Sequence, residues 1–407
     1  MISLEEARSR VLAGCRPAPP RPVAVADALG LVLAEDVDAG EAVPPFASSA
    51  MDGYAVLAAD VAGASEDRPA RLRVVGTLAA GAAPTTPVRA GEAVRIMTGA
   101  PFPPGADAVA IVETTRPAAG AADTVEVLAP TPPGAHIRPA GEDLSAGQRV
   151  FAAGTPLGPG HLGVLASIGR REVLAHPAPT VGVLSTGDEL VEGGGPLAPG
   201  QIRDSNRLTL LSLLRRDGFR TVDLGIARDV EDDIRARIGD GTARCDAVLT
   251  SGGVSMGDFD YVKKVLDELG PMNWMQVAIR PAKPFAFGVL AGTPVFGLPG
   301  NPVSSMVSYE LLARPGLRRL AGHPDDRLAR PAVRAVADAE LRRPGDERVT
   351  YTRVVAAPGP DGRLRARSAG GQGSNLLWPM ALANALAVLP PGPGVAAGGE
   401  VDVLLLG

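Results

Sequence analysis

The residues that could do chemistry gather in the segment between residues 245 and 260, CDAVLTSGGVSMGDFD. Residues 247–250 are predicted to form a short buried strand, which runs into a glycine turn at residues 251–253. A strand that ends in such a turn lets backbone N–H groups approach a phosphate closely. Asp258 and Asp260 follow where a helix is expected to begin, and carboxylates beside a phosphate site commonly hold a metal ion. The segment favours a nucleotide-like ligand with a cation such as Mg²⁺, although an ordinary strand–loop–helix connection has the same pattern.

Two further turns have a similar character. STGDEL (185–190) places Asp188 and Glu189 directly after a strand-end glycine. These acids could serve a metal or phosphate site, or they could be helix-start acids that complement the helix dipole. In LPGNPVS (298–304) two prolines stiffen a loop before a predicted helix, which favours anion binding there, although turn chemistry alone explains it as well. Asp229 is predicted as a helix N-cap, and this role is compatible with facing a ligand.

A third loop supplies cations. IRPAKPF (279–285) brings Arg280 and Lys283 to the same predicted edge of a sheet. Two cations at that edge could neutralise a phosphate or another oxyanion. The alternative is a solvated basic loop, but Pro281 and Pro284 make the segment stiff for a mere surface loop.

The remaining candidates are weak when each is taken alone. They are Asp52 in SSAMDGYAV (48–56), Thr98 in RIMTGAP (95–101), Asp143 in GEDLSAG (141–147), Arg353, and GQGS (371–374). Each of the first three fits a turn, and a lone arginine on a strand is usually a surface residue. The chain has no Ser-His-Asp or Cys-His arrangement and no Walker or Rossmann fingerprint. Its many acids and 4 histidines favour metal-assisted chemistry on a phosphate over imidazole-based catalysis.

Composition limits the class of protein. The 407 residues are 45% hydrophobic and 21% charged, which is enough to build packed cores. The net charge of −5 argues against a general nucleic-acid binder. The 2 cysteines provide no disulfide framework, which fits a reducing compartment. There is no signal-peptide pattern and no apolar stretch long enough to span a bilayer, so we predict a cytoplasmic protein without membrane or nucleic-acid partners.

The elements that must position these residues predict a multi-domain α/β plus β fold. Strand runs separated by Gly/Pro turns fill residues 45–144, strands alternate with helices from about 180 to 322, and strands return after 325. Alternating strands and helices indicate a parallel sheet that is covered on both faces, with ligands at the carboxyl ends of its strands. The predicted domains are an α/β domain (1–22 and 174–322), a connecting domain (23–44 and 145–173), an inserted β domain (45–144) and a C-terminal β domain (323–407).

Taken together and in this order, the motifs SSAMDGYAV, RIMTGAP, GEDLSAG, STGDEL, TSGGVSMGDFDY, KPFAFG, LPGNPVS and GQGS resemble those of the molybdopterin molybdenumtransferase family. The carboxy-terminal domain of gephyrin also belongs to that family. The likeness covers nearly the whole chain, and the set is specific. It implies a Mg²⁺-dependent insertion of molybdate into adenylylated molybdopterin with release of AMP. It also implies an elongated homodimer, whose active-site cleft lies between the molybdopterin-binding-like α/β domain and parts of the partner subunit.

The resemblance also assigns roles to individual residues. Functional acids and hydroxyls are Asp52, Thr98, Asp143, Glu189, Asp229 and Asp260, of which Glu189, Asp229 and Asp260 would hold Mg²⁺. The molybdate set is Arg280, Pro281, Ser304, Arg353 and Ser374. The substrate-binding set is Thr186, Gly187, Gly252, Gly253, Ser255, Lys283, Pro299 and Pro302. Many relatives have lysine where Arg280 stands and some have lysine where Gln276 stands; arginine keeps the charge but changes the donor geometry.

Two other functions remain open at this stage. A molybdopterin adenylyltransferase would share the α/β domain and a similar glycine turn, but it would lack the flanking β domains that this chain has. A dimeric scaffold of the gephyrin type would use the same dimer to cluster partners. The molybdopterin adenylyltransferase that supplies the substrate is a further candidate partner for direct contact.

Overall fold

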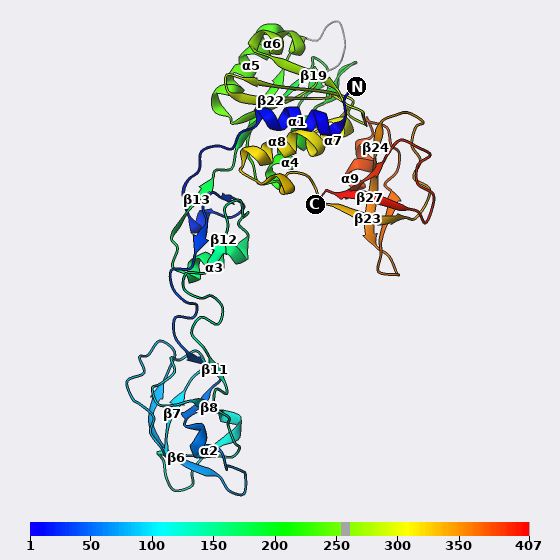
Figure 1. Cartoon of the computed structure of the whole chain (residues 1–407). Coiled ribbons are helices and arrows are strands. Elements are labelled where there is room, and N and C mark those ends of the chain that lie inside the picture. The colour runs from blue at the N-terminus through cyan, green and yellow to red at the C-terminus, as the bar shows by residue number, and fades with distance from the viewer. Residues whose placement is uncertain (254–260, 407) are drawn as a thin grey trace. The chain divides into compact units, whose positions relative to one another are not determined.

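The computed structural model describes residues 1–253 and 261–406, which form two compact units (Figure 1). Unit 1 comprises Met1–Ala34, Gly154–Gly158 and Val173–Gly407, and unit 2 comprises Glu35–Ala153 and Pro159–Glu172. Ser255 and Asp260, two of the predicted site residues, lie outside the described residues. The predicted multi-domain α/β plus β fold class is confirmed.

The centre of unit 1 is a six-stranded sheet with the order β17-β14-β18-β22-β21-β19. The strands β17, β14, β18 and β22 run parallel to one another, as predicted. Strand β21 is antiparallel to both of its neighbours, β22 and β19. Only Ala291 and Gly292 connect β21 to β22, and a connection this short can form only a hairpin. The strands are β14 (Thr180–Thr186), β17 (Arg220–Ala227), β18 (Ala247–Ser251), β19 (Met272–Gln276), β21 (Pro284–Leu290) and β22 (Thr293–Leu298).

Helices cover both faces of this sheet (Figure 1). Along β18, Ala247 and Leu249 pack into one core with α1, α4, α7 and α8, while Val248 packs into the opposite core with α5 and α6. Because successive side chains of a strand point to opposite faces, a continuous apolar strand is stable only when both faces are covered. The helices are α1 (Leu4–Gly14), α4 (Asn206–Arg216), α5 (Glu231–Arg244), α6 (Tyr261–Leu269), α7 (Pro302–Ser308) and α8 (Arg314–Leu320).

The C-terminal strands form a second sheet in unit 1, with the order β20-β24-β25-β23-β27-β26 and an additional β24–β26 pairing that closes it. Tyr351, Leu386 and Leu406 of this part belong to the same core as α1 and α4, so the two sheets share apolar packing. The elements are β20 (Ile279–Arg280), β23 (Ala332–Ala337), β24 (Val349–Pro358), β25 (Leu364–Ser368), α9 (Leu377–Leu382), β26 (Ala385–Leu389) and β27 (Glu400–Leu405). A smaller sheet of unit 1 has the order β1 (Arg21–Ala24), β13 (Glu172–His176), β2 (Val32–Leu33).

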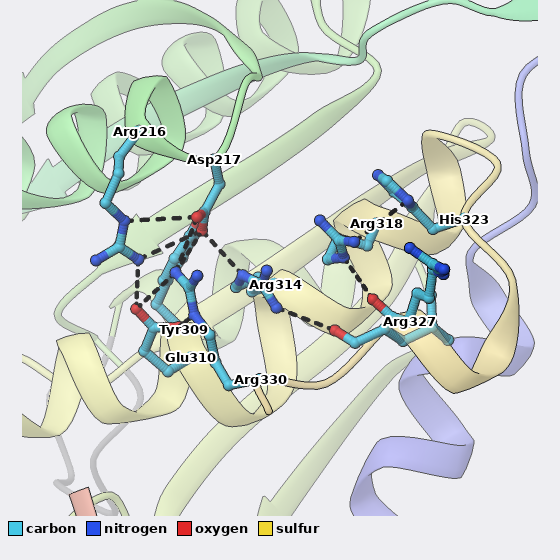
Figure 2. A network of polar contacts seen from close by, with 10 residues as sticks. Arg216, Asp217, Tyr309, Glu310, Arg314, Arg318, His323, Arg327 and Arg330 are labelled. Atoms are coloured by element: carbon cyan, nitrogen blue, oxygen red, sulfur yellow. Dashed lines mark hydrogen bonds and ion pairs between the residues drawn. The ribbon is translucent and has the colours of Figure 1, made fainter. Parts of the chain in front are cut away.

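Two buried carboxylates fasten the helices of unit 1 to the chain that leads into β23 (Figure 2). Arg330 donates from Nη2 to Asp217 at 2.8 Å and from Nε to Glu310 at 2.8 Å. Asp217 also accepts from Arg314 Nε at 3.0 Å and from the Tyr309 hydroxyl at 2.8 Å. Burial alone would raise the pKa of the Asp217 carboxyl, but the nearby guanidinium groups, first that of Arg314 and then that of Arg330, outweigh it and hold the pKa below its usual range.

Unit 2 is built around a six-stranded sheet with the order β8-β5-β7-β6-β10-β9. Strand runs were predicted across residues 45–144, and all six strands of this sheet lie within that range. The elements are β3 (Val37–Asp38), β4 (Ser48–Ser49), β5 (Gly53–Val56), α2 (Ala58–Val61), β6 (Ala70–Leu78), β7 (Glu92–Ile96), β8 (Ala108–Ile111), β9 (Thr115–Pro117), β10 (Thr124–Val127), β11 (Ile137–Arg138), β12 (Arg149–Phe151) and α3 (Pro159–Ser167).

The predicted helix cap at Asp229 is wrong. Ser205 is the N-cap residue of α4, but its side chain makes no capping hydrogen bond; instead Asp204 accepts from the backbone N–H of Arg207 at 3.1 Å. Asp229 is not the N-cap of α5, which begins only at Glu231. The Asp229 carboxylate is therefore not used for capping. Among the residues described, no helix is both long and apolar enough to cross a membrane.

Candidate active-site cleft

A cleft of about 800 Å³ lies at the carboxyl ends of β14, β18 and β22. The three turns singled out from the sequence all line it, because parallel neighbouring strands deliver their carboxyl ends to one edge. The predicted residues found in its wall are Thr186, Gly187, Glu189, Asp229, Gly252, Gly253, Pro299 and Pro302. Lys283 is next to Pro284, which also lines the cleft.

The central turn needs glycine because atoms of neighbouring elements approach its backbone closely. A Cβ on Gly252 would lie 2.8 Å from the carbonyl oxygen of Thr186, and the φ of Gly252 is +101°. A Cβ on Gly253, whose φ is +68°, would lie 2.3 Å from a methyl group of Val262. Both values are far below a normal van der Waals contact, so any side chain here would separate β18 from its neighbours. The turn therefore presents bare backbone to the cleft, as a phosphate site requires.

Acids from two different turns meet in this wall. The backbone N–H of Asp188 donates to the Asp229 carboxylate at 3.4 Å, and that of Asp229 donates to the Asp188 carboxylate at 3.2 Å. This reciprocal pair holds together the turns that carry Glu189 and Asp229, which both line the cleft.

Two of the three predicted metal ligands, Glu189 and Asp229, lie among the described residues. The described residues contain no group of three or more acids, histidines or cysteines that could hold a metal ion. The third predicted ligand, Asp260, is outside those residues. The carboxylate oxygens of Glu189 and Asp229 are the ligand type that Mg²⁺ prefers, so the chemistry of the two described donors fits this ion.

Sequence reasoning missed several polar residues of the cleft. Asn206, at the start of α4, donates from Nδ2 to Ser251 Oγ at 2.8 Å and to the Gly300 carbonyl at 2.7 Å. It thereby ties the ends of β18 and β22 to one helix. Asp204 accepts from Ser185 Oγ at 3.1 Å. The only signal was the run QIRDSNR, which has the composition of a helix cap. Further cleft residues not predicted are Arg203, Asn301 and Asn375.

The buried residue Arg353 is the most unusual cation of unit 1. Its side chain donates to the carbonyls of Gly373 at 3.0 Å and Gly371 at 2.6 Å, and its Nε is buried without a hydrogen-bond partner. Burial lowers the pKa of the Arg353 guanidinium. No carboxylate of the described residues forms an ion pair with it. An unpaired buried cation is costly, so this group is suited to an anionic ligand.

The other predicted molybdate residues lie on elements connected to Arg353. The carbonyl of Ser374 accepts from the backbone N–H of Val303 at 3.0 Å, which joins its loop to the first turn of α7. The Val303 N–H is therefore already used within the protein. It is not free to bind an anion at the start of the helix, as the LPGNPVS loop was predicted to do. Ser304 is buried on the same helix. Arg280, followed by Pro281, pairs with β24 in the register Arg280 to Thr350. None of these residues lines the cleft, although Asn375 next to Ser374 does.

Three predicted residues belong to unit 2. Asp52 accepts from the backbone N–H of Thr98 at 2.7 Å and from its hydroxyl at 2.8 Å. The hydrogen bond from the Thr98 backbone, followed by that from its hydroxyl, holds the pKa of the Asp52 carboxyl below its usual range. The backbone N–H of Asp143 donates to the Val43 carbonyl at 3.0 Å. Asp52 and Thr98 thus form one motif within unit 2.

The fold and the cleft define a multi-domain α/β plus β protein with a polar cleft at the edge of a sheet that is covered on both faces. Residues 2–169 match the MoeA N-terminal region (domain I and II), residues 182–319 a probable molybdopterin binding domain, and residues 334–406 the MoeA C-terminal region (domain IV). The chain is 37% identical to the molybdopterin molybdenumtransferase of Haemophilus influenzae over 98% of this chain and 97% of that protein. It is 33% identical to the Bacillus subtilis protein of the same name over 94% and 89% of the two chains.

The solved structures include a molybdopterin biosynthesis MoeA protein of Pyrococcus horikoshii, which covers 100% of both chains at 27% identity with a TM-score of 0.82. The chain belongs to the molybdopterin molybdenumtransferase family and is a transferase. The resemblance inferred from the sequence motifs is therefore confirmed.

Proposed function

We propose that this chain inserts molybdate into the dithiolene of adenylylated molybdopterin and releases AMP. The observation that carries this proposal is the pairing, within unit 1, of a nucleotide-sized cleft with a separate buried cation, Arg353, that lacks a carboxylate partner. One ligand is expected to be large and polar, and the other small and anionic. Molybdate and a nucleotide-linked pterin meet these two requirements.

The cleft is suited to the nucleotide-linked substrate. Its volume of about 800 Å³ is within the range of ligand pockets. The bare backbone at Gly252 and Gly253 allows a phosphate to approach, and Asn206 fixes the spacing between this turn and the loop at Gly300. These residues would bind and orient the phosphoanhydride that is cleaved when AMP leaves.

Glu189 and Asp229 would hold Mg²⁺ in this cleft, together with Asp260. The ion would supply charge stabilisation on the phosphate oxygens. The protein's own contribution is to keep the two turns together through the reciprocal Asp188–Asp229 hydrogen bonds, so that both carboxylates face the same space.

Molybdate would bind near Arg280 and Arg353, with Ser304 and Ser374 as polar neighbours. Charge-assisted hydrogen bonds to guanidinium groups are stronger than neutral ones, which offsets the repulsion between molybdate and the phosphates of the other substrate. Arg353 is suited to this role because its Nε–H has no acceptor in the described structure.

We further propose that the active form is a homodimer. Leu208 and Ile202 of unit 1 are 67% and 54% exposed, and Ile202 lines the cleft, so these are apolar side chains that a partner subunit could cover. If Asp52 acts on the cleft of the partner subunit, a mixture of Asp52→Asn and Glu189→Gln chains should recover activity that neither variant has alone. A mixture that stays inactive would contradict this arrangement.

The function itself is tested by supplying the purified chain with adenylylated molybdopterin, Mg²⁺ and molybdate. Release of AMP that depends on molybdate is the expected result. Consumption of ATP with unmodified molybdopterin would instead indicate the adenylyltransferase, and the absence of both activities would indicate a scaffold.

A further inference from the structure

Asp346 lies at the centre of a cluster of arginines beside the proposed molybdate site. Its carboxylate forms ion pairs with Arg348 at 2.7 Å, with Arg343 at 3.5 Å, and with Arg280. Three guanidinium groups thus surround one carboxylate, and the cluster keeps an excess of positive charge. Arg280 reaches it from a different part of the chain, 66 residues away in sequence.

Arg280 is only partly satisfied by this contact. Its Nη2 donates to Asp346, while its Nε is buried and has no hydrogen-bond partner among the described residues. The side chain of Arg280 is 38% exposed and that of Asp346 is 30% exposed, so an anion can reach the pair from solvent. An incoming oxyanion therefore meets a guanidinium whose outer nitrogen already has a carboxylate partner.

We propose that Asp346 is an internal competitor for the oxyanion at Arg280, and that it weakens oxyanion binding until the carboxylate is displaced. This inference rests on the proposed function, which places molybdate at Arg280. Two anions that share one guanidinium repel each other, so the negative charge of Asp346 must reduce the affinity for a dianion. Weakly bound oxyanions would dissociate readily, because Asp346 forms its contact with Arg280 again whenever the oxyanion leaves.

Bonds that do not involve the carboxylate charge also shape the loop. Arg343, whose side chain is 1% exposed, donates to the carbonyls of Arg348 at 2.7 Å, Gly392 at 3.1 Å and Asp346 itself. These bonds to backbone oxygens fix residues 343–348. Asparagine at position 346 would also keep an oxygen for the Arg348 backbone N–H, which now donates to Asp346 Oδ1 at 3.1 Å.

The test is calorimetric titration of the purified full-length chain with molybdate alone. Asp346→Asn is expected to bind molybdate about three- to tenfold more tightly than the wild type, the size of effect set by one partly exposed charge contact. Glu347→Gln is the matched control. It removes a negative charge at the next position, where the side chain is exposed and forms no ion pair with the described residues. This control should stay within about twofold of the wild type.

The direction of the change separates competition from a structural role, because a damaged loop would bind molybdate less tightly. Equal or weaker binding by Asp346→Asn, while the wild type binds, would overturn the inference and leave the proposed function intact. Absence of molybdate binding in both proteins would overturn the inference together with the proposed molybdate site. Should circular dichroism show that Asp346→Asn is unfolded, Asp346→Ser, which keeps a hydroxyl acceptor, takes its place with the same expected tightening.

Discussion

Replacing Arg353 by methionine should separate the use of molybdate from the use of the nucleotide. Methionine fills a similar apolar volume but has no charge and no donor. Arg353 is 1% exposed and does not line the cleft. Molybdate would lose a charge-assisted contact worth about 1.5–3 kcal/mol, which corresponds to roughly a 10- to 150-fold drop in kcat/KM for molybdate. The affinity for AMP should stay within about twofold, because no cleft residue is changed.

The effect on folding should be smaller than the effect on activity. The substitution leaves the carbonyls of Gly371 and Gly373 without their donor, at a cost of about 1–3 kcal/mol. It also removes a buried cation that has no carboxylate partner among the described residues, and this gain partly offsets the loss. A net loss of about 1–2 kcal/mol in the free energy of unfolding follows, measurable by urea denaturation.

The assay is the initial rate of AMP release at varied molybdate, combined with a direct titration of AMP binding. Arg367→Met is the control, because Arg367 is an exposed arginine on the adjacent strand β25. It should leave both quantities unchanged. Equal losses in molybdate use and AMP binding by a folded Arg353→Met protein would refute the assignment of Arg353 to the oxyanion.

Two further predictions concern the cleft and the buried network. Gly252→Ala should destabilise the protein by about 1–3 kcal/mol and abolish AMP binding, because the new methyl group meets Thr186 at 2.8 Å. The control is Gly239→Ala in α5, where the space around the Cβ is open. It should be neutral or slightly stabilising in thermal melts. Asp217→Asn should cost about 3–5 kcal/mol at pH 7, since it leaves the buried guanidinium of Arg314 without a carboxylate, whereas Arg330 keeps Glu310; exposed Asp326→Asn should cost almost nothing. The folded-state pKa of Asp217 lies below the ordinary 3.8. Its contribution to the free energy of unfolding is therefore complete above pH 3.8 and is lost as the pH falls through the folded-state pKa. Denaturant titrations in which the stability difference between wild type and Asp217→Asn does not shrink in acid would contradict this linkage.

Local patterns predicted the strands and the convergence of the turns. Alternating strands and helices that form a sheet covered on both faces were predicted from about residue 180, and β14 begins that stretch at Thr180–Thr186. Once four strands are parallel, their carboxyl ends must lie at one edge, so Thr186, Gly252 and Pro299 come together although they are far apart in sequence. This part of the site follows from topology and needs no knowledge of side-chain packing.

The side chains that tie the turns together could not be predicted in the same way. Asn206 contacts Gly300, 94 residues later, and a capping motif gives no information about such a partner. Asp204, rather than Ser205, meets the helix start because its carboxylate is also held by Ser185 and Arg207. Local capping propensity is worth only about 1 kcal/mol, so a buried charge-assisted contact overrides it.

Buried charges in unit 1 fall into two kinds, and the difference separates stability from function. Asp217 and Glu310 are each paired with more than one arginine, which is what a structural network requires once ions are removed from water. Arg353 is also buried but donates only to backbone carbonyls, and its Nε–H has no acceptor in the described structure. The two bonds to carbonyls stabilise the loop at residues 371–373, but they leave the positive charge itself uncompensated, which is costly for a buried group. A bound anion would compensate this charge, and this is the ground on which the proposed molybdate site includes Arg353.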